Sequence, residues 1–404
     1  MLHASVAGSM AHRANMIKIP LDEFSLRTKN AQQLMVKENI DLLFAFGNEA
    51  EPQYQKYFSN YWPSFETAAV IIGKIGEPIL LVGPESLDRA KKLGTIAKVR
   101  KLSVFRESAS PAYYDSSFSS MDQVIDECIG GLSLQRVSIA GNRLLPFDIY
   151  DELKNSLTKF GKVDIICDTI VDTLRRKKTS NELACIQKAC NISTLALDHL
   201  INSMHVGLTE LQAKGIALSK IYELGAEGEG YPFWIMSGEG SNHAIGRASQ
   251  KKISRGDMVQ LQIGARYEGY SSSIARPIII GQAQSWMVPA IIAMRAGEAF
   301  LIENLRSGES SKKLALGFGK IMKENGYYGR LLYGPCHSLG MAECEGPWIE
   351  EQSDFCLEEG MTFGIDIYLD FPEKKYGMRL EDTACVGKQR GVLMTKYSNE
   401  AVIL

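Results

Sequence analysis

The sequence predicts two domains, an α/β domain followed by an α+β domain. Its 404 residues are enough for two separate hydrophobic cores. In the first part, apolar runs typical of buried strands alternate with segments of helical spacing, which predicts a mostly parallel or mixed sheet. The second part opens with two amphipathic helices and then becomes rich in strands. We therefore expect a disordered extension over residues 1–19, an α/β domain over 20–168 and an α+β domain over 169–404.

The composition argues against several kinds of partner. A formal net charge of −2 provides no basic field, so nucleic acid is not an expected partner. No apolar run approaches the roughly 18 residues that a membrane span needs, and residues 1–14 lack the apolar core of a secretory signal. The eight cysteines are scattered without a CxxC pair, which favours reduced thiols. We expect a cytoplasmic protein with no membrane partner.

Local patterns predict the elements of the first domain. Apolar spacing and turn signals favour helices over 26–38, 84–92, 122–129 and 147–157, and strands over 40–46, 68–72, 78–82 and 137–140. Two of these strands flank the turn 74–77 and predict a hairpin. The aromatic-rich segment 53–65 either packs in the core or presents a surface to a partner subunit or a pocket.

The second domain begins after a run of four cations, Arg175 to Lys178, which we interpret as a solvated connector. Thr179 and Glu182 form a capping box that predicts a long helix toward Met204, and Thr209 with Gln212 repeats the signal. Two later helices are expected, from Ser285 or Met287 to about Leu305 and from Ser310 to Asn325. Gly326 is the expected C-cap of the last one.

A hairpin over residues 256–273 carries two neutral residues of interest. Apolar and polar residues alternate up to a turn at Glu268-Gly269, where a second strand starts. We expect the hairpin to bring Gln262 and Ser273 near each other. Three polar motifs follow along the chain, at residues 333–347, 358–367 and 377–383.

The order and spacing of these motifs resemble the creatinase, prolidase and aminopeptidase P family, whose fold is the pita-bread fold. The resemblance covers most of the chain and is specific from Leu174 to Val386. In metal-dependent members, two aspartates, one histidine and two glutamates hold two metal ions. The resemblance places Gln262 and Ser273 at the aspartate positions, and the remaining ligand positions fall at His337, Asp366 and Glu381.

Loss of both aspartates argues against a two-metal site, because a neutral amide and a hydroxyl balance little of the charge of two dications. We therefore expect no cofactor. A single divalent ion (Mn, Co or Zn) on His337, Asp366 and Glu381 is the alternative, and in its absence these three side chains hydrogen-bond one another.

The resemblance also indicates where peptidase chemistry is altered. Cys344 stands where the family has a second histidine, whereas Glu345 is kept. In creatinase, the metal-free branch, a catalytic histidine aligns with Ile245, two positions after His243. In creatinase, an arginine of the first domain reaches the active site of the partner subunit and binds the substrate carboxylate. The resemblance places this arginine near Phe65-Glu66. A homodimer is implied by the resemblance and by the aromatic segment.

These observations predict two sets of site residues. Expected catalytic residues are His337, Glu345, Asp366 and Glu381, because crowded carboxylates raise one pKa into a range useful for acid–base work. Expected substrate-binding residues are His243, Gln262, Ser273, Tyr270, Cys344, Phe65 and Glu66.

The preferred function is metal-independent hydrolysis of a C–N bond in a small nitrogenous compound. One alternative is a protein that binds a small molecule or short peptide without turnover. The other is an Xaa-Pro dipeptidase or aminopeptidase with an atypical metal site.

Overall fold

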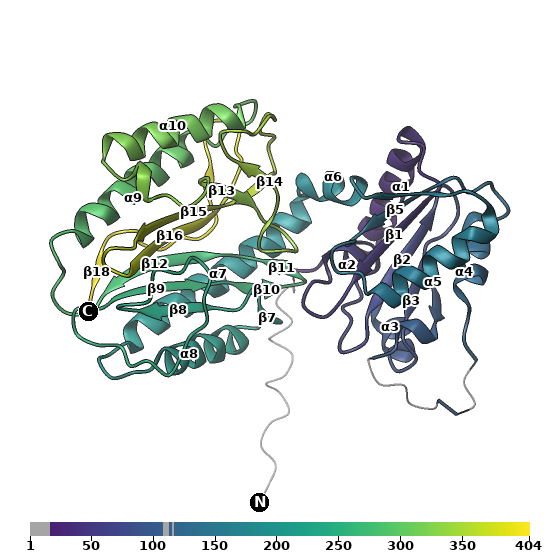
Figure 1. Ribbon diagram of the computed structural model, residues 1–404, viewed down its shortest axis with the longest axis horizontal. Coiled ribbons are helices and arrows are strands. Elements are labelled where there is room, and N and C mark those ends of the chain that lie inside the picture. Colours follow the sequence, from purple (N-terminus) through teal and green to yellow (C-terminus); the bar gives the residue numbers. More distant parts are fainter. Residues whose placement is uncertain (1–16, 108–112, 115–116) are drawn as a thin grey trace, which may run out of the picture.

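The computed structural model describes residues 17–107, 113–114 and 117–404. Two bodies lie side by side and are joined through helices α6 (Ile170–Arg176) and α7 (Ser180–Ser203) (Figure 1). Of the predicted extension over residues 1–19, residues 1–16 lie outside the described residues, and residues 17–19 have no regular structure. Among the described residues, no helix combines the length and the apolarity that crossing a membrane requires.

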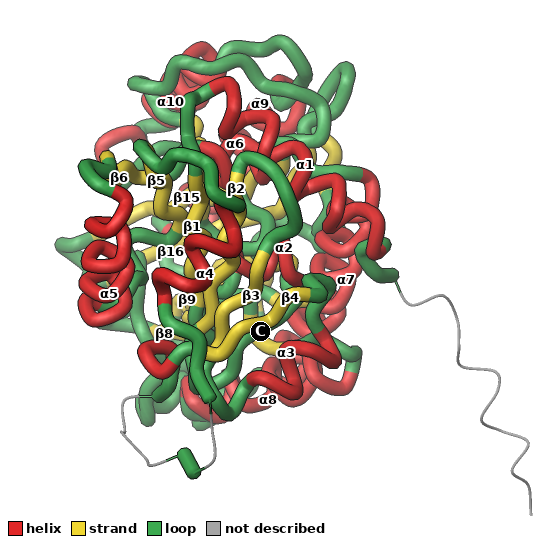
Figure 2. The backbone as a smooth tube through the Cα atoms, turned by 90° about the vertical axis from the view of Figure 1, so that its right-hand side faces the viewer, coloured by secondary structure: helices red, strands yellow, loops and turns green. Residues whose placement is uncertain are grey.

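The first body is built on a six-stranded mixed sheet with the order β4-β3-β2-β1-β5-β6. Only β2 runs against the others, because β1–β2 and β2–β3 are antiparallel while the remaining neighbours are parallel. The predicted mixed sheet and the predicted hairpin are therefore confirmed. Helices cover both faces of this sheet (Figure 2). The strands are β1 (Leu42–Gly47), β2 (Ala68–Gly73), β3 (Ile79–Val82), β4 (Lys98–Lys101), β5 (Arg136–Ala140) and β6 (Asp164–Cys167).

The helices of this body are α1 (Leu21–Lys37), α2 (Gln53–Ser59), α3 (Leu87–Leu93), α4 (Met121–Ile129) and α5 (Phe147–Leu157). Four of the five helices follow the predicted order, two of them with shifted starts, whereas α2 lies in the aromatic-rich segment and was not predicted as a helix. Helix α1 begins five residues early, directly after Pro20, and has Asp22 and Glu23 in its first turn, where carboxylates favour the helix dipole. Helix α3 begins later than Pro84, because the preceding turn is held by Glu66, whose carboxylate accepts the backbone N–H groups of Glu85 and Ser86.

The second body has a curved nine-stranded sheet between two pairs of helices (Figure 1). Helices α7 and α8 (Glu210–Glu223) lie on one side, and α9 (Met287–Asn304) and α10 (Ser311–Glu324) lie on the other. The order is β14-β13-β15-β16-β12-β9-β8, with β17 on β16 and β18 on β12. The strands are β8 (Trp234–Ser237), β9 (Met258–Ile263), β12 (Ile274–Ile279), β13 (Cys336–Ser338), β14 (Glu345–Ile349), β15 (Thr362–Phe371), β16 (Tyr376–Cys385), β17 (Val392–Leu393) and β18 (Val402–Ile403).

A small sheet of β7 (Gly228–Glu229), β10 (Ala265–Tyr267) and β11 (Tyr270–Ser271) extends the hairpin. Its turn is at Glu268-Gly269, as predicted. Both residues have positive φ, 51° and 84°, which the glycine adopts at no steric cost. Both predicted capping boxes are also confirmed, at Thr179 with Glu182 and at Thr209 with Gln212.

The interpretation of residues 175–178 as a solvated connector is wrong for Arg175 and Lys178, whereas Lys177 is exposed. Arg175 and Lys178 are both buried, and the side chains of both form ion pairs with Glu345. Lys178 Nζ also donates to Ser338 Oγ at 3.4 Å. Burial lowers the pKa of Lys178, although the Glu345 carboxylate opposes this. The cations therefore link the inter-domain segment to the strand that carries Glu345.

Helix α8 contains an internal glycine that offers a test of the fold. Gly215 has no positive φ, and a Cβ added there meets no atom within 4 Å. We expect Gly215→Ala to raise the free energy of unfolding by about 0.5–1 kcal/mol, because glycine loses more backbone entropy on folding than alanine. Urea unfolding monitored by circular dichroism measures the difference, and a destabilised variant would contradict the packing described for α8.

Candidate active site

Strand register places the polar residues of the second domain in one row across the sheet. Gln262 on β9 is opposite Ala275 on β12, which is opposite Glu381 on β16, which is opposite Asp366 on β15. Residues directly opposite each other in a sheet point to the same face. His337 on β13 joins this face through Gly364, its partner on β15, because Gly364 lies two residues before Asp366. Strand pairing therefore places side chains close together on one face of the sheet although they are far apart in the sequence, as Gln262 and Glu381 are, separated by 119 positions.

Gln262 bridges two charged side chains. Its Nε2 donates to Glu381 Oε2 at 2.5 Å, and its Oε1 accepts a hydrogen bond from Arg379. Arg379 Nη2 also donates to the backbone oxygen of Ala244 at 2.6 Å, and its guanidinium lies over the Trp234 ring. Both hydrogen-bonding ends of the amide are therefore engaged within the protein.

Ser273 is likewise occupied by protein atoms. Its hydroxyl is 2.9 Å from the hydroxyl of Tyr231, and its backbone N–H donates to Thr383 Oγ1. Burial raises the pKa of Tyr231 well above its usual value, and nearby Glu381 adds to the effect. Gln262 lies on β9 and Ser273 directly precedes β12, and the two side chains thus have different partners.

His337 faces two carboxylates. Its Nδ1 is 3.1 Å from the backbone oxygen of Ser338, and its Nε2 is 3.7 Å from Glu343 Oε1 and 3.5 Å from Glu381 Oε1. Burial acts to lower the pKa of His337, but Glu343 and Glu381 raise it well above its usual value overall. Burial raises the pKa of Glu343 to about 7, against the opposing effect of His337.

Asp366 is held at one oxygen and free at the other. Its Oδ2 accepts from the Tyr333 hydroxyl at 2.8 Å and lies 3.5 Å from Arg379 Nη1. Its buried Oδ1 has no hydrogen-bond partner among the described residues, and neither does Arg379 Nε. Burial raises the pKa of Asp366, although the Arg379 guanidinium opposes the shift.

A cavity of about 410 Å³ opens over this row of residues. Its charged lining residues are His337, Glu343, Glu350, Asp366 and Arg379. Its walls are mostly apolar, from Trp234, Ala244, Ile245, Leu332, Tyr333, Trp348 and Ile349. Cavities of this size bind small molecules. The cavity is therefore the candidate active site.

Some predicted site residues belong to this cavity and others do not. His337, Cys344 and Asp366 line it, while Gln262, Ser273 and Glu381 are buried beside its polar part. Glu345 is outside the lining set and forms ion pairs with Arg175 and Lys178.

Three other predicted residues have different surroundings. The Tyr270 hydroxyl is buried between Arg27 and Glu182, where it accepts from the former and donates to the latter. His243 is exposed next to Ala244, which lines the cavity. Glu66 is 2% exposed and holds the turn before α3, so its carboxylate is not presented to a neighbouring molecule, contrary to the prediction.

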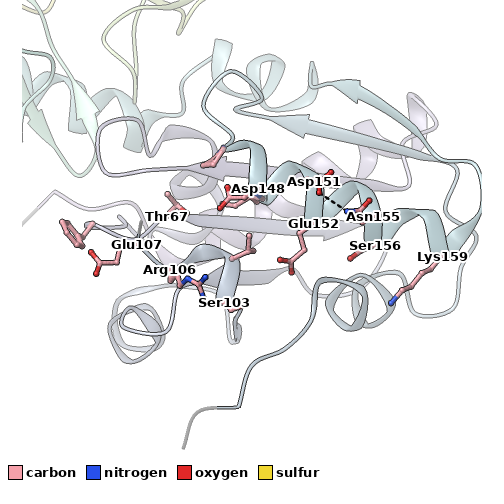
Figure 3. A pocket seen from close by; sticks show the side chains of 14 residues that line it. Thr67, Ser103, Arg106, Glu107, Asp148, Asp151, Glu152, Asn155, Ser156 and Lys159 are labelled. Atoms are coloured by element: carbon pink, nitrogen blue, oxygen red, sulfur yellow. Dashed lines mark hydrogen bonds between the residues drawn. The ribbon is translucent and has the colours of Figure 1, made fainter. Parts of the chain in front are cut away.

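Phe65 is 74% exposed and lines a different cavity, of about 920 Å³, in the first domain (Figure 3). Asp148, Asp151 and Glu152 of helix α5 lie along one side of this cavity, and Ser103 and Arg106 face them. All of its charged lining residues are exposed or only half-buried, and none belongs to the row across the second sheet.

Sequence reasoning gave no role to Glu343, Arg379 or Tyr231. Arg379 could have been found, because it lies two residues before Glu381 on a predicted strand and therefore on the same face. Glu343 lies between two strands, at the position before Cys344, and carries no local signal. Its approach to Glu381 depends on the sheet.

Comparisons with known proteins agree with this geometry. Residues 184–388 match the model of metallopeptidase family M24. Two Xaa-Pro dipeptidases are each 30% identical to the chain. That of Pyrococcus furiosus aligns over 247 residues, 61% of this chain and 70% of its own, and that of Pyrococcus horikoshii over 260 residues, 64% and 73%.

The similarity to solved structures covers a larger part of the chain than the similarity in sequence does. The prolidase of Pyrococcus horikoshii superposes with a TM-score of 0.77 at 24% identity, covering 92% of this chain and 99% of its own. The Xaa-Pro dipeptidase of Bacillus anthracis gives 0.78 at 21% identity, with 94% and 100% covered. The fold is thus the pita-bread fold of the prolidases and aminopeptidases P. The chain belongs to metallopeptidase family M24, which supports a peptidase-like hydrolase.

Family membership implies a metal centre, and the donors present decide which kind fits. A two-metal centre does not fit, because the Gln262 amide is bound to Arg379 and Glu381, and Ser273 is bound to Tyr231. A hydroxyl and an engaged amide are poor replacements for anionic oxygens. One group of three donors remains among the described residues, namely His337, Glu343 and Glu381, whose ligand atoms lie within 4.8 Å of one another.

Proposed function

We propose that this chain hydrolyses an amide-type C–N bond in a small nitrogenous compound, and that it does so without a two-metal centre. The supporting observation is the pair of unpartnered buried atoms in the cavity wall, Asp366 Oδ1 and Arg379 Nε. Buried polar atoms nearly always have a partner. A carboxylate oxygen and a guanidinium nitrogen without one are therefore suited to a bound polar ligand.

Asp366 acts as the general base and then as the general acid. Its Oδ2 is held by Tyr333, which orients the free Oδ1. In the reaction, a water oxygen adds to the carbonyl carbon and one water proton goes to Asp366. The C–N bond then breaks, and the same proton passes to the leaving nitrogen, so that an acid and an amine are released. Groups in this role contribute about 10²–10⁴-fold to the rate.

Arg379 stabilises the oxygen that becomes negative during this addition. Its guanidinium is fixed by Gln262, by the Ala244 carbonyl and by the Trp234 ring, so that little reorganisation is needed when charge develops. The apolar walls bind the remainder of the substrate. We therefore expect compounds with one apolar group, in contrast to creatine-like substrates that are polar throughout.

The test is turnover of a panel of small amides, amidines, guanidines and Xaa-Pro dipeptides by the purified protein. We expect Asp366→Asn to lower kcat by about 10²–10⁴-fold, because the amide cannot carry the proton. Asp354→Asn is the matched control, since Asp354 is exposed and outside the cavity-lining set. Full activity of Asp366→Asn would contradict the mechanism.

The same panel separates the alternatives. Turnover confined to Xaa-Pro dipeptides would point to a dipeptidase like the relatives of that name. Binding of a panel compound without turnover of any compound would replace hydrolysis by a binding role.

The proposed setting is a homodimer in the cytoplasm. All eight cysteines are free, which supports a reducing compartment, and the exposed Phe65 supports contact of the aromatic segment with a second copy. Sedimentation should give twice the chain mass of 44.7 kDa. A monomer at micromolar concentration would contradict the dimer.

A further inference from the structure

The side chains of His337, Glu343 and Glu381 converge without hydrogen-bonding one another. The Nε2 atom of His337 lies 3.5 Å from Glu381 Oε1 and 3.7 Å from Glu343 Oε1. Hydrogen bonds between nitrogen and oxygen are about 2.7–3.2 Å long, so both separations exceed the usual length. The interpretation that the polar residues of the site only hydrogen-bond one another therefore does not describe this group.

The separations match those of donors that share one ion. Nitrogen and oxygen donors lie about 2.0–2.2 Å from a zinc ion, so two neighbours around a tetrahedral ion are about 3.4 Å apart. The distances from His337 to the two glutamates are close to this value, and all three donor atoms lie within 4.8 Å of one another.

Two further observations favour a cation between these donors. Glu381 is 0% exposed, and within the described part of the chain its Oε1 has no hydrogen-bond partner, while its Oε2 accepts from Gln262. A buried carboxylate oxygen without a partner is costly. The Nδ1 atom of His337 is 3.1 Å from the Ser338 carbonyl, the arrangement that orients the other ring nitrogen of a metal-binding histidine.

The charges near this group allow one cation and disfavour a second. Arg379 lies 3.5 Å from Asp366 and donates a hydrogen bond to Gln262. Its guanidinium therefore supplies a positive charge beside Asp366 and Gln262, where a second cation would be repelled. Asp366 is engaged there by Tyr333 and Arg379. On the other side, the only ion pairs of Glu343 and Glu381 among the described residues are with His337, while Arg379 is linked to Glu381 through the Gln262 amide.

We propose that His337, Glu343 and Glu381 bind one divalent cation, with Glu343 supplying a carboxylate that the aspartate positions lack. One imidazole and two carboxylates suit Mn²⁺, Co²⁺ or Zn²⁺. The ligand set differs from the single-metal alternative considered from the sequence, because Glu343 replaces Asp366. It also revises the expectation of no cofactor. The cation would share the cavity of the proposed hydrolytic site, but its binding does not depend on turnover.

The experiment measures cation binding in the absence of substrate. The full chain is stripped with a chelator and titrated calorimetrically with Zn²⁺, Mn²⁺ or Co²⁺, and bound metal is counted by elemental analysis after desalting. We expect one equivalent per chain and a rise in Tm on binding. Glu343→Gln should weaken binding at least about tenfold, because an amide replaces an anionic ligand.

Two variants keep the result interpretable. Asp366→Asn should bind the cation as wild type does, which separates this ligand set from the one considered from the sequence. Circular dichroism of each stripped variant checks the fold, and His337→Asn is a second ligand variant should Glu343→Gln not fold. The proposal is overturned by zero or two equivalents of metal, or by unchanged affinity in a folded Glu343→Gln.

The outcome is independent of the proposed reaction. A chain that binds one cation but turns over no panel compound would refute hydrolysis alone. A chain that hydrolyses a compound after stripping, and binds no cation, would refute the cation site alone.

Discussion

Replacing Glu345 by alanine should lower the free energy of unfolding by about 3–5 kcal/mol. Glu345 is the ion-pair partner of both Arg175 and Lys178, which are buried, so the substitution leaves Lys178 without its ion-pair partner and Arg175 with Asp172 at 3.9 Å. Denaturant unfolding monitored by fluorescence measures the loss. We expect the largest effect on stability of any substitution considered for this chain.

Glu358→Ala is the control for this prediction. Glu358 pairs with Lys177 at 3.6 Å, and both side chains are more than half exposed, so this ion pair should contribute less than about 1 kcal/mol. The sequence had suggested a catalytic role for Glu345. Loss of turnover at unchanged stability in Glu345→Ala would support that role and contradict the structural one.

Replacing Gly364 by alanine should disrupt the candidate active site directly. A Cβ at this position would lie 2.8 Å from Glu381 Oε1, 2.8 Å from His337 Cε1 and 2.9 Å from His337 Nε2. These contacts are too short, so His337 and Glu381 must move apart. We expect cation affinity to fall at least about tenfold, as for changes that misplace ligand side chains, and stability to fall by about 1–3 kcal/mol from overpacking.

Gly329→Ala controls for the effect of adding a methyl group. A Cβ there meets no atom within 4 Å, and Gly329 has no positive φ. This variant should keep the activity, the cation affinity and the stability of the wild type. A Gly364→Ala protein with wild-type cation affinity would show that the positions of His337 and Glu381 do not limit binding.

Elements with local signals were predictable. The capping boxes at Thr179 and Thr209 and the Glu268-Gly269 turn depend on residues within four positions of each other, and all three are present. The start of α3 was less accurate, because the turn before it is held by Glu66, about 20 residues away. The burial of Arg175 and Lys178 was missed for the same reason, since their partner Glu345 lies about 170 residues further on.

By itself, the sequence determined the capping boxes, the hairpin turns, most of the elements and the motifs that resemble the family, and it predicts a division into two domains. Capping, turn formation and strand alternation are short-range effects, so neighbouring residues are enough to predict them. Which side chains meet was decided by the tertiary structure. Strand pairing sets Gln262 against Arg379 and Glu381, and it brings His337 and Glu343 to Glu381, because register across a sheet depends on residues far apart in the chain.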